Sequence, residues 1–318
     1  MPRDTFISEW KPMRAIAITA ESAPLTLIEL DRPKPGAGEV LVRVKTSSLN
    51  GFDVAVANGY LTGMMEHKYP VVLGKDFAGI VEDLGGGVTR FRLGDEVFGV
   101  VTESVLSSGS FAEYIVVDES ASIYAIPDGA TMSDAGAIGL AGAAAIDSID
   151  AAKIEPLDVV LIVGATGGVG TLILQYAVDA KANVIATATP GIAAEFVTDL
   201  GAAATVNPEE DLAEQVIRLA PGGVDVIFHL AGDPARLPLV LSERGRIIST
   251  LGYGVDKHPL ATAIMANPSQ ATLARLAADM ASERIGVPIT DTFELDQLPE
   301  AIAAFPEGTL GKHAINIA

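Results

Sequence analysis

Apolar and polar positions alternate over short stretches in the first 126 residues of the chain. These stretches are rich in β-branched residues, and turns containing Pro-Gly, Gly-Gly or Asp separate one stretch from the next. The predicted strands are Met13–Ala20, Glu39–Ser48, Val71–Leu73, Gly79–Leu84, Glu96–Val101 and Ala112–Val117. This pattern predicts a largely antiparallel, barrel-like or sandwich domain over residues 1–126.

From residue 127 to residue 284, apolar strand-like runs alternate with stretches of helical periodicity. The predicted strands are Val159–Val163, Val184–Thr187, Val224–Leu230 and Arg246–Leu251, and the predicted helices lie near 133–150, 168–180, 192–200, 209–219 and 268–283. Strands that alternate with helices in this way form a parallel, doubly wound sheet. We therefore predict an α/β protein whose second domain spans residues 127–284.

The tail, residues 285–318, returns to strand character. Strands are expected at Ile289–Leu295 and at Ala314–Ile317, with a short helix after Asp296. We expect this tail to fold back and to complete the domain formed by residues 1–126.

One uncharged stretch, Val159–Val178, has the length of a membrane span. Four glycines lie in its centre, and glycine weakens a continuous helix. We therefore interpret the stretch as a buried strand, a tight turn and a buried helix.

The turn in this stretch carries the strongest chemical signal in the sequence. It has the form Gly-x-x-Gly-x-x-Gly, with an additional glycine, between a buried strand and an amphipathic helix. Glycines allow the backbone to turn tightly and to approach a pyrophosphate, which the N-terminus of the following helix attracts. The residues predicted to bind a dinucleotide here are Gly164, Thr166, Gly167, Gly168, Val169 and Gly170.

The next predicted strand ends close to where the adenosine ribose of the dinucleotide would lie. NAD sites usually place Asp or Glu there, but this chain has Thr187 and Thr189, and its first acid is Glu195. The missing carboxylate favours NADPH over NADH, because nothing repels a 2′-phosphate. No Lys or Arg lies between residues 182 and 217, so hydroxyl and amide groups are expected to hold the phosphate.

Charge and cysteine content narrow the classes of function. The 318 residues include 41 acidic and 21 basic side chains, and the net charge of −20 argues against nucleic acid or a membrane as a partner. The first dozen residues contain no apolar signal-peptide core, so we expect a cytoplasmic protein. Cysteine is absent, and the four histidines have no ligand-like spacing, so no metal is expected.

Several blocks together make the chain similar to the medium-chain dehydrogenase/reductase superfamily, and within it to the zinc-free quinone oxidoreductase branch. The blocks run in family order over nearly the whole chain: Val42–Asp53, Pro70–Gly79, Gly94–Gly99, Gly109–Tyr114, the glycine turn, Leu200–Ala202 and Leu310–Lys312. The resemblance implies a GroES-like catalytic domain built from both chain ends, a Rossmann domain between them, and a site in the cleft.

The resemblance also bears on zinc. Zinc alcohol dehydrogenases of this superfamily carry Cys-Gly-x-Asp and Gly-His-Glu blocks, whereas this chain has Asn50 at the Cys position and Lys75 and Asp76 in place of His and Glu. Their cysteine-rich structural zinc lobe is missing as well. Zinc-dependent alcohol oxidation is therefore not expected.

A reductase without zinc needs hydrogen-bond donors for the negative charge that develops on its substrate. The candidate catalytic residues are Asn50, Tyr60 and Lys75. Each also has a structural interpretation: Asn50 in a turn, Lys75 as the ion-pair partner of Asp76 or Asp53, and Tyr60 packed in its loop. Asp53 and Asp76 themselves are expected to be structural.

Three further segments are candidates for substrate and cofactor contacts. Residues 58–67 mix glycine with soft apolar side chains and are interpreted as a mobile loop that faces a flat hydrophobic substrate. By resemblance, Leu230, Leu251, Gly252 and Tyr253 lie near the nicotinamide. His229 ends a buried strand, where we expect a satisfied core histidine.

Together these features predict an oxidoreductase that transfers hydride from NADPH to a quinone or an α,β-unsaturated carbonyl compound. The alternative is an NADPH-binding regulatory or structural module without turnover. The expected partners are a small hydrophobic carbonyl or quinone substrate and, by family analogy, a second copy of the chain in a homodimer.

Overall fold

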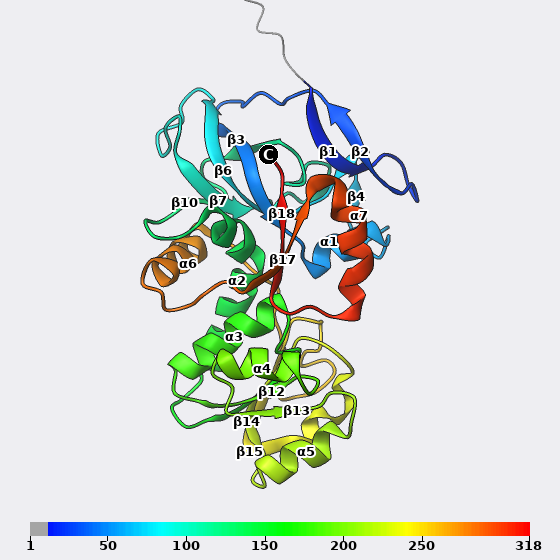
Figure 1. The fold of residues 1–318 in the computed structure, drawn as a ribbon, viewed down its shortest axis with the longest axis vertical. Helices are drawn as coiled ribbons and strands as arrows, with labels where there is room; N and C mark the ends of the chain where they lie inside the picture. Colours follow the sequence, from blue (N-terminus) through cyan, green and yellow to red (C-terminus); the bar gives the residue numbers. More distant parts are fainter. Residues whose placement is uncertain (1–11) are drawn as a thin grey trace, which may run out of the picture.

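The structure is a computed structural model that describes residues 12–318. Residues 1–11, which carry most of the argument about a signal peptide, lie outside this part. In Figure 1 the described residues form an upper and a lower group of elements, with both chain ends contributing to the upper group.

The upper group consists mostly of short strands. They are β1 (Met13–Ile18), β2 (Leu25–Leu30), β3 (Glu39–Ser48), β4 (Glu66–His67), β5 (Val71–Val72), β6 (Asp76–Leu84), β7 (Glu96–Val100), β8 (Val105–Leu106), β9 (Tyr114–Asp118) and β10 (Ile123–Ala125). Their main pairs, β1 with β2, β3 with β6 and β9, and β6 with β7, are antiparallel, as predicted. Strands β2, β4, β8 and β10 were not predicted; β4 and β8 have only two residues each, too few for a periodic pattern.

A short helix, α1 (Gly51–Ala57), interrupts the predicted run of strands directly after β3. Asn50 stands at its N-cap, and the Asp53 side chain accepts a hydrogen bond of 2.9 Å from the Asn50 amide. This capping hydrogen bond stabilises the first turn of α1. It depends on polar residues, so a search for apolar periodicity does not detect it. It also fixes the backbone at Asn50.

The C-terminal tail joins the upper group. It contains β17 (Ile289–Glu294), α7 (Leu298–Ala304), β18 (Lys312–Asn316) and the short 3-10 helices η2 (Leu295–Gln297) and η3 (Phe305–Glu307). Strand β18 pairs antiparallel with β3 and parallel with β17. These pairs extend the sheet in the order β10-β7-β6-β3-β18-β17.

The lower group is built around a parallel sheet of six strands, in the order β13-β12-β11-β14-β15-β16. The strands are β11 (Val159–Val163), β12 (Asn183–Thr187), β13 (Ala204–Val206), β14 (Val224–His229), β15 (Leu241–Ser249) and β16 (Ala261–Ala263). The helices between these strands are α3 (Gly168–Asp179), α4 (Ile192–Asp199), α5 (Leu212–Leu219) and η1 (Pro234–Val240), whereas α6 (Gln270–Ala281) follows β16 and packs against β10 of the upper group. The predicted doubly wound α/β architecture is confirmed, with β13 and β16 as additional edge strands.

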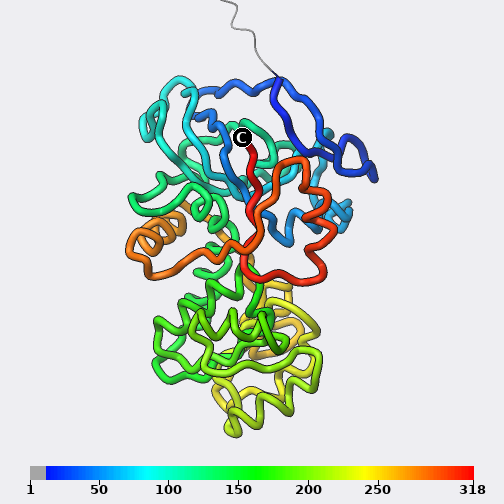
Figure 2. The backbone as a smooth tube through the Cα atoms, viewed as in Figure 1, coloured from blue at the N-terminus to red at the C-terminus, as the bar shows by residue number. Residues whose placement is uncertain are grey.

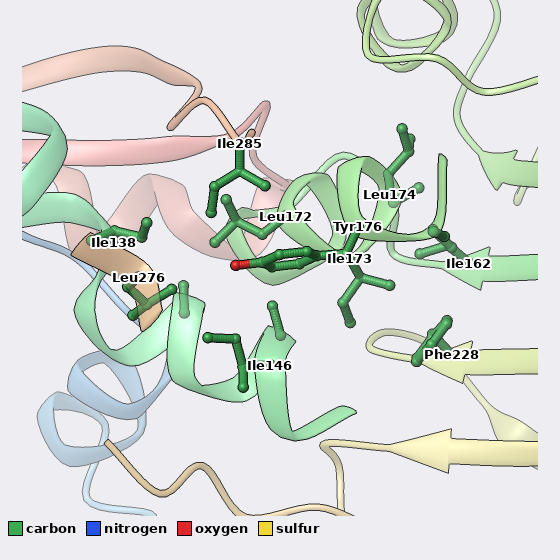
Figure 3. Close-up of a cluster of buried hydrophobic side chains, with 14 of the residues drawn as sticks. Ile138, Ile146, Ile162, Leu172, Ile173, Leu174, Tyr176, Phe228, Leu276 and Ile285 are labelled. Carbon is green, nitrogen blue, oxygen red and sulfur yellow. The ribbon is translucent and has the colours of Figure 1, made fainter. Parts of the chain in front are cut away.

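A long helix, α2 (Met132–Ala152), packs between the two groups. Figure 3 shows Ile138 and Ile146 of this helix facing the ring of Tyr176 from α3, with Leu276 of α6 beside them. The helix is long and apolar enough to cross a membrane by length and composition alone, but 72% of its most apolar window is buried. The uncharged stretch 159–178 forms β11, a turn and most of α3, as predicted.

Candidate functional site

The carboxyl ends of the central parallel strands meet at one edge of the lower sheet. Val163 of β11 pairs with His229 of β14, which in turn pairs with Ser249 of β15. The turns that follow these strands therefore lie side by side, and such an edge is where open α/β sheets bind their ligands. The candidate site is built from these turns and from the residues of the upper group that face them.

The glycine turn after β11 requires glycine at two positions. Gly164 has a φ of +91°, and a Cβ atom there would lie 3.0 Å from the Cβ of Ala231. A Cβ atom on Gly170 would overlap the carbonyl oxygen of Gly164. The turn is therefore tight enough to bring the start of α3 close to the end of β11.

Helix α3 begins without a compensating group at its N-terminus. Its N-cap residue is Gly167, no side chain caps it, and its first turn contains no acidic residue. The first amide groups of a helix have no partner within the helix, and together with the helix dipole they attract an anion. The amides of Gly168, Val169 and Gly170 thus provide the features of a pyrophosphate site.

The end of β12 lies beside this turn. The Thr187 hydroxyl accepts a hydrogen bond of 2.9 Å from the Gly164 amide, and Thr187 is buried. Thr189 is exposed, two residues further on. The two threonines therefore differ in their contacts: the Thr187 hydroxyl bonds the glycine turn, whereas the Thr189 side chain is exposed to solvent.

The remaining predicted cofactor residues follow β14 and β15. Leu230 is half-buried and donates its amide to the Val163 carbonyl oxygen at 2.9 Å. Leu251 and Gly252 are exposed, and Tyr253 is half-buried. The structure places these residues along the same edge of the sheet as the glycine turn.

The C-terminal tail covers the glycine turn from the upper group. The amide of Gly311 donates to the Thr166 carbonyl oxygen at 2.6 Å, and Gly167 forms a parallel bridge with Gly311. A Cβ atom on Gly168 would lie 2.5 Å from Cδ of Lys312. Figure 2 shows this red tail segment passing between the upper and lower groups.

Lys312 leads from the glycine turn into a set of buried polar side chains, which we call the polar cluster: Ser48, Asn50, Asp53, Asp76 and Lys312. The Lys312 ammonium donates to Oδ1 of Asn50 at 2.8 Å and to the Leu49 carbonyl oxygen at 3.3 Å. It lies 3.6 Å from Oδ2 of Asp76. One buried cation is thus shared between the amide of Asn50 and the carboxylate of Asp76.

The Asp76 carboxylate accepts three hydrogen bonds within and beside the polar cluster. Its Oδ2 accepts from the Ser48 hydroxyl at 2.6 Å and from Nδ2 of Asn50 at 2.8 Å. Its Oδ1 accepts from the Leu140 amide of α2 at 2.6 Å, and a Cβ atom on Gly139 would lie only 2.8 Å from this oxygen. The glycines of α2 therefore allow the helix to approach the carboxylate.

Burial changes the pKa values of Asp53 and Lys312 in the polar cluster. Desolvation raises the pKa of Asp53 to about 7, although its carboxylate accepts backbone hydrogen bonds from Asn50 and from Gly74. Desolvation also lowers the pKa of Lys312, against the attraction of Asp76 and Asp53. Since an isolated buried charge is costly, the cation and the carboxylates depend on one another.

The three predicted catalytic residues are only partly brought together. Asn50 lies in the polar cluster, where its side-chain amide donates to Asp76 at 2.8 Å and to the Ser48 carbonyl oxygen at 3.3 Å. Lys75 donates to the Val101 carbonyl oxygen at 2.9 Å and lies 4.6 Å from the centre of the Phe52 ring. Tyr60 follows α1, with 72% of its surface exposed.

Lys75 interacts electrostatically with Asp53 and Asp76, and among the described residues its ammonium forms its hydrogen bond with the Val101 carbonyl oxygen instead. Within the described residues the cation paired with Asp76 is Lys312, which is 236 positions away in sequence and which we did not predict for this role. A signal for it exists: Lys312 opens a strand in which four of five residues are buried, and a buried lysine needs a partner. The carboxylate that partners it is identified only by the tertiary structure.

The donor set at this position does not fit a zinc ion. In the described part of the chain, no group of three or more His, Asp or Glu side chains could hold a metal. Oδ1 of Asn50 already accepts a bond from an ammonium group, and Lys75 adds a second cationic side chain. Zinc prefers thiolate, imidazole and carboxylate ligands, whereas neighbouring ammonium groups repel it.

Comparisons with known proteins agree with this geometry. Residues 36–128 match the model of the alcohol dehydrogenase GroES-like domain, and residues 168–266 match that of the zinc-binding dehydrogenase family. The quinone oxidoreductase from Coxiella burnetii superimposes with a TM-score of 0.86 at 26% sequence identity, covering 97% of this chain and all of the other.

Two sequence relatives show different extents of overlap. The chain is 31% identical over 238 residues to the chloroplast envelope quinone oxidoreductase homolog of Arabidopsis thaliana, covering 71% of this chain and 70% of that protein. It is 35% identical over 217 residues to a mycocerosic acid synthase-like polyketide synthase of Mycobacterium tuberculosis. That match covers 67% of this chain but only 10% of the synthase.

Proposed function

The chain belongs to the medium-chain dehydrogenase/reductase superfamily, an oxidoreductase family that binds a nicotinamide cofactor, and on this premise we propose that it reduces a quinone or an α,β-unsaturated carbonyl compound with NADPH, without zinc. One observation carries the proposal. Lys312 connects the glycine turn to Asn50 and Asp76 of the polar cluster, two residues that by resemblance stand where zinc relatives carry metal ligands.

The proposed cofactor site follows the edge of the parallel sheet. The turn residues Gly164, Thr166, Gly167, Gly168, Val169 and Gly170 would hold the pyrophosphate at the start of α3. Thr187 and Thr189 would flank the adenosine ribose, and Leu230, Leu251, Gly252 and Tyr253 would flank the nicotinamide. The cofactor, when bound, supplies a hydride from C4 of its nicotinamide ring.

The proposed zinc independence rests on the chemistry of the side chains. A substrate oxygen that gains negative charge needs a Lewis acid or hydrogen-bond donors. Lys75 and Tyr60 are proposed as these donors, since each retains N–H or O–H capacity beyond its observed contacts. Both N–H groups of the Asn50 amide are already donated, so its proposed contribution is to hold Lys312.

The proposed substrate is small, flat and hydrophobic. The loop after α1 exposes Tyr60 and Met64, by 72% and 76% of their surfaces, beside the short strand pair β4 and β8. Exposed aromatic and thioether groups are suited to a flat apolar ring. Two relatives described above are a quinone oxidoreductase and a homolog of one, which is consistent with this substrate class.

A substrate panel tests the proposed reaction. The purified protein is mixed with NADPH and with quinones and α,β-unsaturated ketones, and the loss of NADPH absorbance is followed. Turnover of members of either class supports the proposal. Tight NADPH binding without any turnover would instead favour the alternative, a regulatory or structural cofactor-binding module.

The proposed preference for NADPH has its own test at Thr189, because the Thr187 hydroxyl is occupied by the Gly164 amide. Thr189→Asp places a negative charge beside the proposed 2′-phosphate. It should weaken the binding of NADPH about tenfold and change the affinity for NADH little. Thr198→Asp, an exposed threonine near the other end of α4, controls for the added charge. Equal loss of both cofactors in Thr189→Asp would refute the ribose assignment. Fluorescence titration measures the affinities of the wild type and of both variants for NADPH and for NADH.

Three further features are part of the proposal. The domains are residues 1–126 completed by 285–318, and residues 127–284. The protein is a cytoplasmic homodimer that associates through an edge of its parallel sheet, where β13 and β16 each have one unpaired side. Light scattering on the purified protein tests the dimer, and a monomer at micromolar concentration would refute it.

A further inference from the structure

We infer that His229 is a positioning residue that holds the turns after β14 and β15 in one arrangement, and so sets the affinity for the nicotinamide half of the cofactor. The inference rests on the proposed function, because that function places the nicotinamide against these turns. His229 itself is buried, with 2% of its surface exposed, and so it is not proposed to contact the cofactor.

The hydrogen bonds of His229 define which ring nitrogen carries the proton. Nε2 lies 3.0 Å from the carbonyl oxygen of Gly232, and a carbonyl oxygen can only accept, so Nε2 is protonated. Nδ1 lies 2.9 Å from the hydroxyl oxygen of Ser249. In the neutral ring Nδ1 is an acceptor, and the Ser249 hydroxyl therefore donates to it.

Ser249 completes the arrangement on its other side. Its hydroxyl oxygen accepts from the Leu251 amide at 3.1 Å and from the Tyr253 amide at 3.4 Å. A serine hydroxyl offers one donor and two acceptor positions, and all three are used here. The chain Gly232–His229–Ser249 thus fixes the turn 250–253 without leaving a buried donor or acceptor unpaired.

The same histidine is connected to the glycine turn through its neighbours. The backbone of His229 lies between β11 and β15, and its carbonyl oxygen accepts from the Thr250 amide at 3.3 Å. Leu230, the next residue, lies against Gly164, where an added Cβ would be 3.2 Å from the Leu230 Cβ. The His229 side chain therefore bonds the turn after β14 directly and, through the Ser249 hydroxyl, the turn after β15.

Removing this link should affect one half of the cofactor only. In Ser249→Ala and in His229→Leu the turn 250–253 loses its fixed hydroxyl acceptor, while the glycine turn keeps its bond to Thr187. We expect NADPH to bind about tenfold more weakly, the effect of one lost buried hydrogen bond. Binding of 2′-phospho-ADP-ribose, which lacks nicotinamide, should change less than about twofold.

Ser249→Ala is compared with the same substitution at another buried serine, and His229→Leu is compared with a second substitution of His229. Ser148→Ala removes a fully buried hydroxyl that has no hydrogen-bond partner among residues 12–318, so both affinities should stay unchanged. His229→Asn keeps an acceptor oxygen near the position of Nδ1 and should regain part of the affinity that His229→Leu loses. Failure of His229→Asn to improve on His229→Leu would contradict the role of the Ser249 bond.

The outcomes separate this inference from the proposed function. If Ser249→Ala weakens both nucleotides equally, or neither, the positioning role is refuted while the wild-type protein still binds NADPH. If the wild-type protein binds neither nucleotide, the proposed function fails and the inference fails with it. Nitrogen-15 NMR of the histidine rings adds a measurement without ligand: a proton on Nδ1 of His229 would refute the hydrogen-bond arrangement.

Discussion

Asp53 provides a sharp test of the electrostatics of the polar cluster. Its side chain is 1% exposed, and burial raises its pKa to about 7 from the ordinary value of 3.8. Between these two pH values the folded protein keeps a proton that the unfolded chain has lost. The contribution of Asp53 to stability must therefore decrease as the pH rises from 3.8 to about 7, and it levels off above that range.

The magnitude follows from the size of the shift. Each unit of pKa corresponds to about 1.4 kcal/mol, so Asp53 should remove about 4 kcal/mol of unfolding free energy between pH 4 and pH 8. The variant Asp53→Asn has no ionisable group at this position, so its unfolding free energy does not include the pH-dependent loss that Asp53 causes. The difference in stability between wild type and variant should thus shift by about 4 kcal/mol in favour of the variant as the pH rises.

Urea unfolding followed by circular dichroism, repeated across this pH range, measures the difference. Carboxylates remote from Asp53 titrate in both proteins, so their effects cancel in the comparison, whereas the coupling of Asp53 to Asp76 and Lys312 is part of the measured difference. Asp118→Asn is the control, because the hydroxyl and amide of Ser120 lower the pKa of the exposed Asp118 carboxyl. The stability that Asp118 contributes is lost only as the pH falls below about 4, so its curve should run parallel to that of the wild type above pH 5.

One outcome would refute the reasoning. If the difference between wild type and Asp53→Asn changes by less than about 1 kcal/mol over the range, the carboxylate is not penalised by burial. In that case the two backbone donors, Asn50 and Gly74, compensate for the lost hydration, and the cluster holds Asp53 as a stable anion.

Two further predictions concern the residues that join the cluster to the glycine turn. Lys312→Met leaves Asp76 without its buried cation and should lower the unfolding free energy by about 3–5 kcal/mol, whereas the double variant with Asp76→Asn should recover part of this loss. Urea unfolding measures both, and purely additive losses would contradict the pairing. Gly170→Ala places a methyl group against the Gly164 carbonyl oxygen and should weaken NADPH binding at least about a hundredfold. Gly222 has open space around it, so Gly222→Ala should leave NADPH binding unchanged. Equal NADPH affinities of the two alanine variants would show that the turn tolerates a side chain.

Local patterns in the sequence were enough to find most of the fold. The alternation of strands and helices after residue 127 predicted the parallel sheet, and β11 and the turn after it were placed correctly because buried strands and glycine turns leave strong local signals. Helix α1 and the strands β4 and β8 were missed. These elements are short and their stability comes from caps and from neighbours, so they leave little periodic pattern.

The candidate site also contains one part that the sequence predicted and another that it did not. The glycine turn was visible in the sequence because its conformation is a property of a few consecutive residues. The pairing of Lys312 with Asn50 and Asp76 was not, because it joins residues from the two ends of the chain. Likewise, Thr187 at the end of β12 and Thr189 after it look equivalent in sequence, but only the Thr187 hydroxyl accepts a hydrogen bond from the Gly164 amide.

The sequence by itself thus determined the class of the fold, the glycine turn between β11 and α3 and the absence of thiol ligands, because composition and local periodicity carry this information. Only the tertiary structure decided which cation lies in the polar cluster and which turns His229 connects. The physical reason is burial. A charge or an imidazole removed from water must find its partner in space, and β-sheet pairing brings that partner from any distance along the chain.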